Sequence, residues 1–309
     1  VCAGTYEQVL GLQAKNNWFQ AFVVQARTPQ IAFGVSTRSM PNYKTPVDLK
    51  GKKIGIAPSD AASYMVVNSL LARARLTTSE VNLFEFSNSA SALGALRSGQ
   101  IDAISYADPA MTMLEQKGDI KIIADTRTLK GAREVFGGAM PSASLFAPSE
   151  FIQKNPNTFA ALYRAVLTSA AMARLPGNRE LIAKVISPTQ YLNQPEAVIS
   201  QVLTGKFADG LGKIQNVPDR ADFDPMPWQS LAVWMLTQMK RWGYIKGNVD
   251  YKQIAEKVFL ITDARKHMKD LGQTVPPGGN YIKHKIMGKE FDAAKPEEYL
   301  KTFAIHKMG

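Results

Sequence analysis

The sequence has very few of the residues that build disulfides and metal sites. Its single cysteine, Cys2, excludes a disulfide within the chain and any site with several cysteine ligands. Its three histidines lie in the last 45 residues, and their spacing matches no histidine-based metal motif. We therefore expect no bound metal, and we expect structural or surface roles for His267, His284 and His306.

Cofactor motifs, long apolar runs and an excess of acidic residues are also missing. No P-loop, dinucleotide fingerprint or nucleophile elbow is present, so nothing indicates catalysis or a cofactor. No apolar run approaches the roughly 20 residues that span a bilayer. The 26 Asp and Glu against 37 Lys and Arg give a formal charge of +11, which favours anionic ligands. Because the basic residues are spread along the chain, we expect no nucleic-acid partner.

The length of 309 residues and the 45% hydrophobic content are sufficient for two globular domains. Up to residue 147, segments of strand and helix pattern alternate. This order predicts an α/β fold with mainly parallel sheets. We read residues 125–141 as a polar, glycine-containing loop, and we expect strands at 1–4, 21–25, 31–36, 53–57, 83–86, 101–105, 120–124 and 144–147.

After residue 147 the pattern is helical. An apolar stripe on one of these helices is predicted to be core rather than a ligand site, because its spacing is that of a packed helix. It consists of Trp228, Leu231, Met235, Met239 and Trp242. From Arg265 onward the chain carries nine Lys and Arg against five Asp and Glu, and we read this basic tail as a solvated surface extension. The expected helices are 156–175, 179–186, 194–204, 228–242 and 251–260.

The stretch at residues 47–68 predicts a strand, 53–57, that runs directly into a helix beginning at Ala61. Free backbone N–H groups and the helix dipole make such a helix start suitable for a small anion, although most turns of this kind bind nothing. In open α/β sheets, ligands lie at the carboxyl ends of the strands. We therefore expect one shared edge that contains Ser59, Asp60, Ala61, Ala62, Ser63, Tyr106 and Asp108.

Three segments resemble substrate-binding proteins of bacterial ABC importers: VDLKGKKIGI, SGQIDAISYADP and TRTLKGAREVFGGAMPSASLFAPSEFIQKNP. The likeness covers most of residues 1–260. It is to the branch that includes nitrate, taurine, alkanesulfonate and thiamine-pyrimidine binders. The resemblance implies a two-lobed type II periplasmic-binding fold, location in the periplasm and delivery of the ligand to an ABC permease in the inner membrane.

The same resemblance implies a discontinuous domain organisation. Lobe I would comprise residues 1–38 and 146–309, with a basic extension from about residue 272, and lobe II would comprise residues 39–145. Proteins of this kind have a strand, a helix and a second strand before the point where this sequence starts. Lobe I is therefore expected to lack its usual N-terminal strands.

The resemblance also implies the two walls of a ligand cleft. In lobe I the wall would contain Thr5, Tyr6 and Glu7. In lobe II it would contain Ser59, Asp60, Ala61, Ala62, Ser63, Tyr106, Asp108, Gly138, Met140 and Pro141. We expect helix N-termini and hydroxyls to hold a sulfonate, carboxylate or nitrate group, and a neutral heterocycle stays open. The tyrosines that can stack on the ligand, or equally pack within a lobe, are Tyr6, Tyr64 and Tyr106.

Two alternatives remain at this point. The same fold serves enzymes that act on small pyrimidine or carboxylate metabolites, but neither expected wall holds a histidine or clustered cysteines. It also serves as the effector domain of transcription regulators, which would need a helix-turn-helix segment upstream. We expect a monomer that closes about a hinge on its ligand. For the anion's partner, Arg133 is a candidate that could also be a surface residue.

Overall fold

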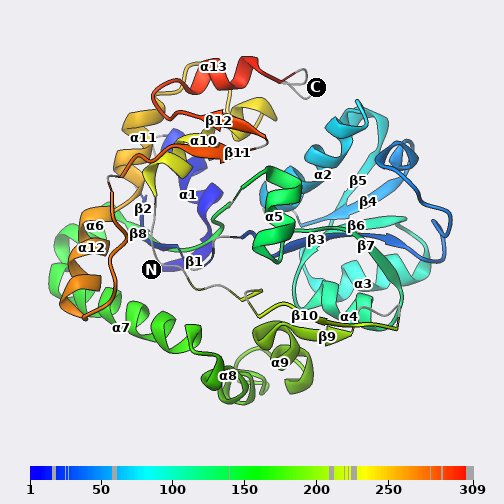
Figure 1. Ribbon diagram of the computed structural model, residues 1–309, viewed down its shortest axis with the longest axis horizontal. Coiled ribbons are helices and arrows are strands. Elements are labelled where there is room, and N and C mark those ends of the chain that lie inside the picture. The colour runs from blue at the N-terminus through cyan, green and yellow to red at the C-terminus, as the bar shows by residue number, and fades with distance from the viewer. Residues whose placement is uncertain are drawn as a thin grey trace. The chain divides into compact units, whose positions relative to one another are not determined.

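The computed structural model, shown in Figure 1, divides the chain into two compact units. Unit 1 comprises Val1–Pro29, Gly137–Arg174 and Asp222–Met308, and unit 2 comprises Gln30–Phe136 and Leu175–Ala221. The structure describes residues 1–15, 19–24, 26, 28–57, 61–138, 140–208, 212–218, 220–221, 223, 228–278, 280–286 and 288–303.

Unit 2 is built on a five-stranded sheet with the strand order β5-β4-β6-β3-β7. β4 pairs in parallel with β5 and β6, whereas β3 pairs antiparallel with β6 on one side and β7 on the other. Four strands therefore run in one direction and β3 runs against them. The bounds are β3 Ile31–Ser36, β4 Lys53–Ile56, β5 Asn82–Glu85, β6 Ala103–Ala107 and β7 Ile120–Asp125.

Helices and short turns complete unit 2. Leu96, Leu114 and Ile104 belong to a core in which α3 and α4 pack on the sheet. The C-terminal segment of the unit adds two helices and a β-hairpin. The elements are η1 Pro46–Leu49, α2 Ala61–Arg73, η2 Thr78–Glu80, α3 Ser89–Ser98, α4 Ala110–Gln116, α5 Leu129–Phe136, η3 Pro176–Asn178, α8 Arg179–Ile186, α9 Glu196–Thr204, β9 Lys206–Ala208 and β10 Ile214–Asn216.

Unit 1 contains a three-stranded sheet in the order β1-β8-β2, in which both strand pairs are antiparallel. One of its hydrophobic clusters joins Phe22 of β2 to Tyr163 of α7 and Met268 of α12. The elements are β1 Cys2–Thr5, α1 Tyr6–Ala14, β2 Phe19–Val24, β8 Ala143–Pro148, α6 Ser149–Lys154, α7 Pro156–Arg174, α10 Gln229–Arg241, α11 Tyr251–Val258, α12 Ile261–Asp270, β11 His284–Ile286, β12 Lys289–Phe291 and α13 Pro296–Lys301.

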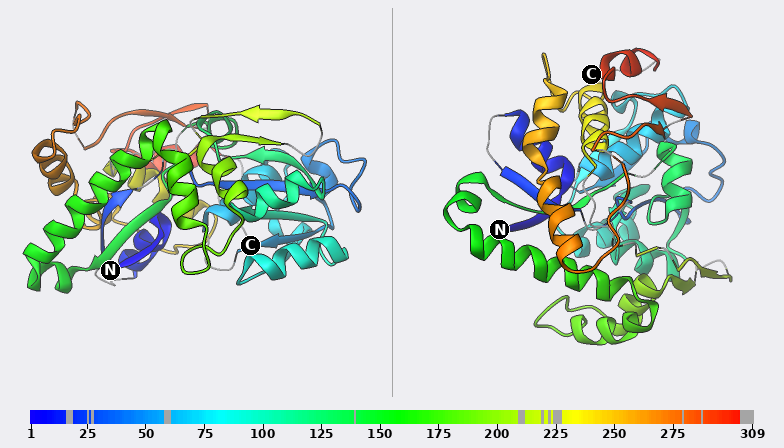
Figure 2. Two further views of the ribbon diagram at one scale, coloured as in Figure 1. Left: turned by 90° about the horizontal axis from the view of Figure 1, so that it is seen from below. Right: turned by 60° about the vertical axis from the view of Figure 1, so that its left-hand side comes forward.

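The apolar stripe of α10 is core, as predicted. Every residue of α10 except Lys240 is buried. Figures 1 and 2 show the β11–β12 ribbon and α13 beside this helix. The Tyr299 hydroxyl donates to the Ile286 carbonyl (3.1 Å), and the indole of Trp234 approaches that hydroxyl at 3.4 Å. The prediction of a solvated tail is therefore wrong for the part that contains Phe291, Tyr299 and Leu300, which are buried, whereas more than half of the described residues from Arg265 onward are exposed.

The α/β class is confirmed, and the structure corrects three details. The sheet of unit 1 pairs only antiparallel among the described strands. In unit 2 four of the five strands run in one direction, but two of the four strand pairs are parallel and two are antiparallel. Residues 125–141, expected as a loop, contain α5. The helical stretch expected at 156–175 is preceded by a further short helix, α6.

The compact units also differ from the predicted division at residues 38 and 145. β3 belongs to unit 2, since it pairs on both sides with strands of that unit. Residues 175–221 also belong to unit 2, where the Arg179 guanidinium donates to the carbonyls of Leu203, Pro218 and Ala221. That the two units act as the lobes of a cleft stays a prediction.

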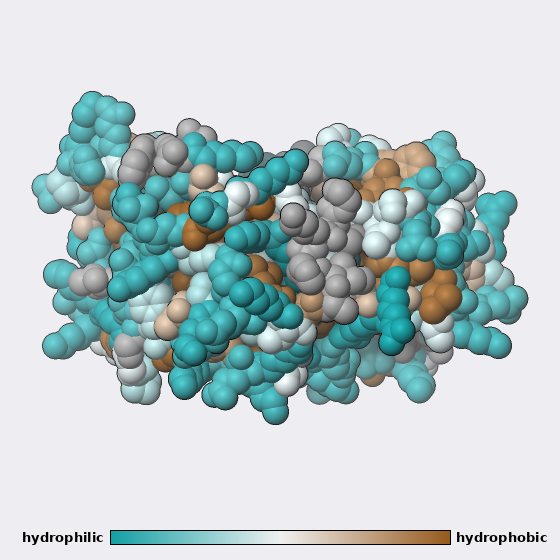
Figure 3. Space-filling view, turned by 90° about the horizontal axis from the view of Figure 1, so that it is seen from above, coloured by the Kyte–Doolittle hydropathy of each residue, from teal (hydrophilic) through white to brown (hydrophobic). Residues whose placement is uncertain are grey.

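The surface is largely polar. Figure 3 shows one face on which hydrophilic side chains dominate and apolar ones form small separate groups. Within the described part of the chain, no helix combines the length and apolar character needed to cross a membrane.

Two glycines that end helices provide a matched test of backbone packing. Gly99 ends α3 at φ +77° and Gly205 ends α9 at φ +73°. A Cβ at Gly99 would meet no atom within 4 Å, whereas at Gly205 it would lie 1.8 Å from the Val217 carbonyl oxygen. Gly99→Ala should cost about 1–2 kcal/mol from the left-handed conformation alone. Gly205→Ala should cost at least about 1 kcal/mol more, because the backbone must also shift. Urea unfolding measures the free energy of unfolding of both variants. An equal decrease for Gly99→Ala and Gly205→Ala would contradict the packing described at Gly205.

Candidate functional site

The predicted site of unit 2 lies where β4 and β6 end and α2 begins. Ser59 and Asp60 lie outside the described residues, and α2 starts at Ala61. Ala62 and Ser63 are fully buried, and Tyr64 is half-buried. The Ser63 hydroxyl donates to the Ser105 carbonyl, and the Ser105 hydroxyl donates back to the Ser63 carbonyl, both at 2.9 Å. These reciprocal bonds fix the start of α2 against the end of β6.

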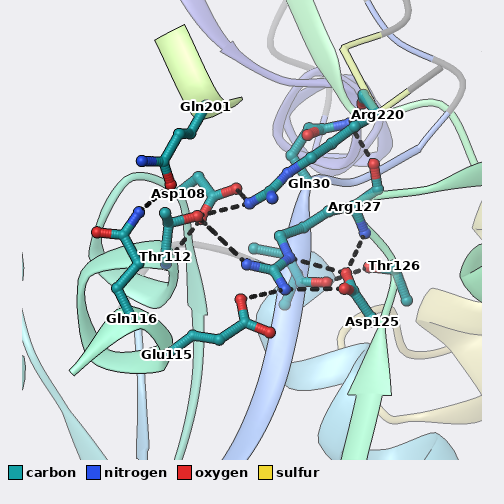
Figure 4. Close-up of polar contacts among 11 residues, drawn as sticks. Gln30, Asp108, Thr112, Glu115, Gln116, Asp125, Thr126, Arg127, Gln201 and Arg220 are labelled. Carbon is teal, nitrogen blue, oxygen red and sulfur yellow. Dashed lines mark hydrogen bonds and ion pairs between the residues drawn. The ribbon is translucent and has the colours of Figure 1, made fainter. Parts of the chain in front are cut away.

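Tyr106 and Asp108 follow on the same edge. Tyr106 is 8% exposed and its hydroxyl donates to the Phe86 carbonyl at 3.2 Å. Asp108 comes just after β6, and its carboxylate accepts several bonds (Figure 4). Its Oδ1 accepts from the backbone N–H of Thr112 (3.1 Å), from the Thr112 hydroxyl (2.8 Å) and from Arg127 Nη1 (3.4 Å). Its Oδ2 accepts from Arg220 Nη2.

Arg127 is the centre of this network. It follows β7, its side chain is fully buried, and it donates to both carboxylate oxygens of Asp125 at 2.8 Å. Its Nη2 also donates to Glu115 at 3.0 Å. The ring of Phe207, in β9, lies 5.6 Å from the Arg127 guanidinium and 4.1 Å from that of Arg220. Paired carboxylates and a stacked aromatic ring compensate two cations that would be very costly to bury alone.

The network sets the ionisation of its carboxylates. Burial acts to raise the pKa of Asp108, but the charges of Arg127 and Arg220 outweigh it, and the pKa is lowered from its ordinary value of 3.8. For Glu115, burial prevails over Arg127 and the pKa is raised. The geometry therefore holds an ionised Asp108 between two guanidinium groups.

Gln30 ties three separate stretches of unit 2 together. It is the first residue of the unit, adopts φ +57°, and its side-chain amide donates to the carbonyls of Arg127 (3.3 Å) and Arg220 (2.9 Å). Sequence reasoning did not find Arg127 or Arg220, and it named Arg133, which is exposed. The signal that was available is positional, since Arg127 comes directly after a predicted strand, as Asp108 does.

The predicted residues of unit 1 lie at the start of α1. The backbone N–H of Thr5 donates to Gln8 Oε1 (3.1 Å), and that of Tyr6 donates to the Ser142 carbonyl (2.6 Å). Tyr6 and Glu7 are buried, and the Tyr6 ring centroid lies 4.0 Å from that of Phe259. Burial first, and then Tyr281 and Glu7, raise the pKa of the Tyr6 phenol, so it is neutral at pH 7.

Three buried hydroxyls near this helix start have no hydrogen-bond partner among the described residues: Thr5 Oγ1, Tyr6 Oη and Ser144 Oγ. Ser144 lies in β8 opposite Gly4 of β1. A buried hydroxyl without a partner is destabilising, so such groups are candidates for binding a polar solute. The arrangement places these hydroxyls next to the buried carboxyl group of Glu7.

Gly138, Met140 and Pro141 were predicted for the wall of lobe II, but they belong to unit 1. Met140 and Pro141 are buried next to β8 in sequence, and Gly138 packs against β11, with a Cβ position 3.3 Å from the Lys285 carbonyl oxygen. This difference arises because the chain leaves unit 2 directly after α5, at Phe136. These residues therefore share a unit with Thr5 and Tyr6. That these residues line a ligand cleft stays a prediction.

The histidines have structural surroundings. His267 is buried, and His284 Nε2 lies 2.8 Å from the Ser230 hydroxyl. His306 lies outside the described residues. In the part of the chain that the structure describes, no group of three or more His, Cys, Asp or Glu is placed to hold a metal ion.

We expect the Asp108 network to raise the free energy of unfolding in a way that depends on pH. Asp108→Asn should cost about 3–5 kcal/mol at pH 7, because it leaves buried guanidinium groups without their counter-charge. Asp119→Asn is the control: it removes the half-exposed pair with Arg97 and should cost at most about 1 kcal/mol. Because the folded-state pKa of Asp108 is lowered, its contribution is present above about pH 4 and is lost as pH falls through that pKa.

Urea unfolding at several pH values tests both parts. The stability difference between wild type and Asp108→Asn should shrink below pH 4. An equal cost for the two substitutions, or a difference that is independent of pH, would contradict the described network.

Comparisons with known proteins are consistent with the resemblance found in the sequence. A family profile described as "NMT1/THI5 like" matches residues 6–175. The nitrate/nitrite binding protein NrtA of Nostoc sp. (strain PCC 7120) is 29% identical over 177 residues, which cover 54% of this chain and 40% of that protein. The chain thus spans less than half of that relative.

Two solved structures extend the likeness to most of the chain. A protein from Bordetella bronchiseptica RB50 is 37% identical, with a TM-score of 0.68 over 88% of this chain and 80% of that one. The periplasmic nitrate-binding protein NrtA from Synechocystis PCC 6803 has a TM-score of 0.79 at 17% identity, over 93% of this chain and 77% of that one. The second likeness concerns the fold alone.

Proposed function

Because this chain belongs to the NMT1/THI5-like family, we propose that it is the solute-binding component of an ABC importer. The observation that carries the proposal is the fold: the structure of the periplasmic nitrate-binding protein from Synechocystis PCC 6803 superposes on 93% of the chain. In this proposal the protein acts in the periplasm as a monomer, hands its solute to an inner-membrane permease and does no chemistry on it.

The proposed solute is a small anion of the sulfonate, carboxylate or nitrate class. In unit 2 the start of α2 lies at the edge where β4 and β6 end, and the N-terminal end of a helix favours an anion. In unit 1 the start of α1 places the hydroxyls of Thr5 and Tyr6. A formal charge of +11 favours the approach of an anion. The printed name of the Nostoc relative, a nitrate/nitrite binding protein, supports the same charge class.

The proposed mechanism is closure of the two units on the solute. The wall in unit 1 would comprise Thr5, Tyr6, Glu7, Gly138, Met140 and Pro141, and the wall in unit 2 would comprise Ser59, Asp60, Ala61, Ala62, Ser63, Tyr64, Tyr106 and Asp108. A solute that contacts both walls favours the closed state by the difference in its affinity for the closed and open states. Asp108 would act by holding the loop after β6 in place, since its carboxylate is engaged by Arg127 and Arg220.

A thermal-shift screen tests the proposed ligand class. The probes are nitrate, bicarbonate, taurine, ethanesulfonate, short carboxylates and a neutral pyrimidine. A ligand present at 100 times its Kd stabilises the folded protein by about 2.7 kcal/mol, which should raise the Tm by a few degrees. A shift with an anion and none with the pyrimidine supports the proposal. A shift with the pyrimidine alone would overturn the anionic class, and no shift with any probe would overturn the proposed solutes.

A pair of tyrosine substitutions tests the site in unit 1. Tyr6 and Tyr163 are both fully buried, and their hydroxyls have no hydrogen-bond partner among the residues that the structure describes. Tyr163 lies in the separate cluster around Phe22. Removing either hydroxyl should leave stability unchanged within about 1 kcal/mol, because no hydrogen bond is lost. Tyr6→Phe should weaken binding of the solute found in the screen about tenfold, and Tyr163→Phe should not. Isothermal titration measures both, and equal affinities for the two variants would remove Tyr6 from the site.

A further inference from the structure

Unit 1 contains a pocket of about 740 Å³ that shares no residue with the proposed solute walls. This volume is within the range of small-molecule sites, which is about 300–1,000 Å³. Three stretches that are distant in sequence form it: the start of α11, the segment before β11, and the turn between β12 and α13. It is lined by Val249, Asp250, Tyr251, Lys252, Tyr281, Ile282, Lys283, Asp292, Ala293, Ala294 and Pro296.

Hydrogen bonds and ion pairs fix the walls of this pocket. The Tyr251 hydroxyl donates to Glu297 Oε1 at 2.7 Å, and the same oxygen pairs with Lys240 at 2.6 Å. Glu297 thereby ties α13 to α10 and α11. The Tyr281 hydroxyl donates to Glu256 Oε1 at 3.4 Å. The pocket is thus formed by folded elements, although the sequence pattern of this region predicted a solvated tail.

The charges around the pocket are not equally available. The Asp250 carboxylate accepts the backbone N–H of Gln253, and the Asp292 carboxylate accepts that of Ala294, both at 2.9 Å. Lys252 lies 3.9 Å from Glu256, at the limit of an ion pair. Lys283 makes no hydrogen bond or ion pair with any residue that the structure describes. Both carboxylates keep their negative charge, so the lining carries two negative and two positive groups. Lys283 is the one among them without a partner in the described part of the chain, since Lys252 faces Glu256.

The remaining lining is carbon-rich and neutral. Val249, Ile282 and Pro296 contribute aliphatic surface, and Tyr251 and Tyr281 contribute aromatic rings. Burial and then Glu256 raise the pKa of Tyr281 to about 12, so this phenol carries no charge at pH 7. Aromatic walls beside an unpaired ammonium suit a ligand with an apolar or aromatic body and one anionic group.

We propose that this pocket is a second ligand site, for a small amphipathic anion such as an aromatic sulfonate or carboxylate. The ring system lies between Tyr251 and Tyr281, and Lys283 at the rim pairs with the anionic group. Because the pocket is contained in unit 1, the proposal does not depend on the proposed transport function or on closure of the two units.

The test uses 8-anilinonaphthalene-1-sulfonate, whose fluorescence rises when its rings enter an apolar pocket. We expect saturable binding to the folded protein that weakens as NaCl is raised. Lys283→Glu should weaken binding on the order of tenfold, since it replaces attraction by repulsion. Lys285→Glu is the matched control, since it makes the same charge change on an exposed lysine that does not line the pocket.

A second variant tests the pocket independently of charge. Ala294→Phe places a ring at an exposed lining position, so it should occupy the pocket and abolish binding while the protein stays folded by circular dichroism. Nitrate or taurine, added at constant ionic strength, should leave the probe's affinity unchanged, which separates this site from the proposed transport solute. Probe binding that survives both Lys283→Glu and Ala294→Phe, or that responds equally to Lys285→Glu, would overturn the proposal.

Discussion

Unit 2 depends on the buried ion pairs that join Asp108 to Arg127 and Arg220. Arg220 belongs to the second chain segment of the unit, whereas Asp108 and Arg127 belong to the first, so their contact connects the two segments. Removing charges of this kind from water costs several kcal/mol per ion, which only mutual pairing and hydrogen bonding repay. The shared carboxylate thus joins the second segment to the first at a buried position.

Much of the fold could be predicted because its signals are local. The strands of unit 2 are short apolar runs between turns. A glycine is typical of helix ends, and Gly99 ends α3 in the left-handed conformation. α5 was missed because Gly131 lowers helix propensity by about 1 kcal/mol. The structure requires glycine there for a tertiary reason, since a Cβ would lie 1.6 Å from the Asp125 carbonyl oxygen. The tail was missed because its buried Phe291 and Tyr299 follow no period and are held by contacts with α10.

The positions of candidate residues at strand ends could be predicted from the sequence. The unit to which the residues after α5 belong could not. Tyr106 and Asp108 lie at the end of β6 as expected. Gly138 and Met140, which the resemblance assigned to lobe II, lie in unit 1, because the exit of the chain after α5 has no local signature. A single sequence does not show which of 37 basic residues are buried. The position of Arg127 after a predicted strand is a signal for it, whereas Arg220 became visible only with its partners.

The spacing of the Asp108–Arg220 pair affects synthesis of the chain. The two residues are 112 positions apart, so a ribosome that adds about 5–20 residues per second makes the arginine roughly 6–22 s after the aspartate. During that interval the nascent sheet carries a carboxylate that lacks one of its two cationic partners. We therefore expect an early fragment of unit 2 to be less stable than the finished unit, so that the emerging polypeptide stays unfolded for longer.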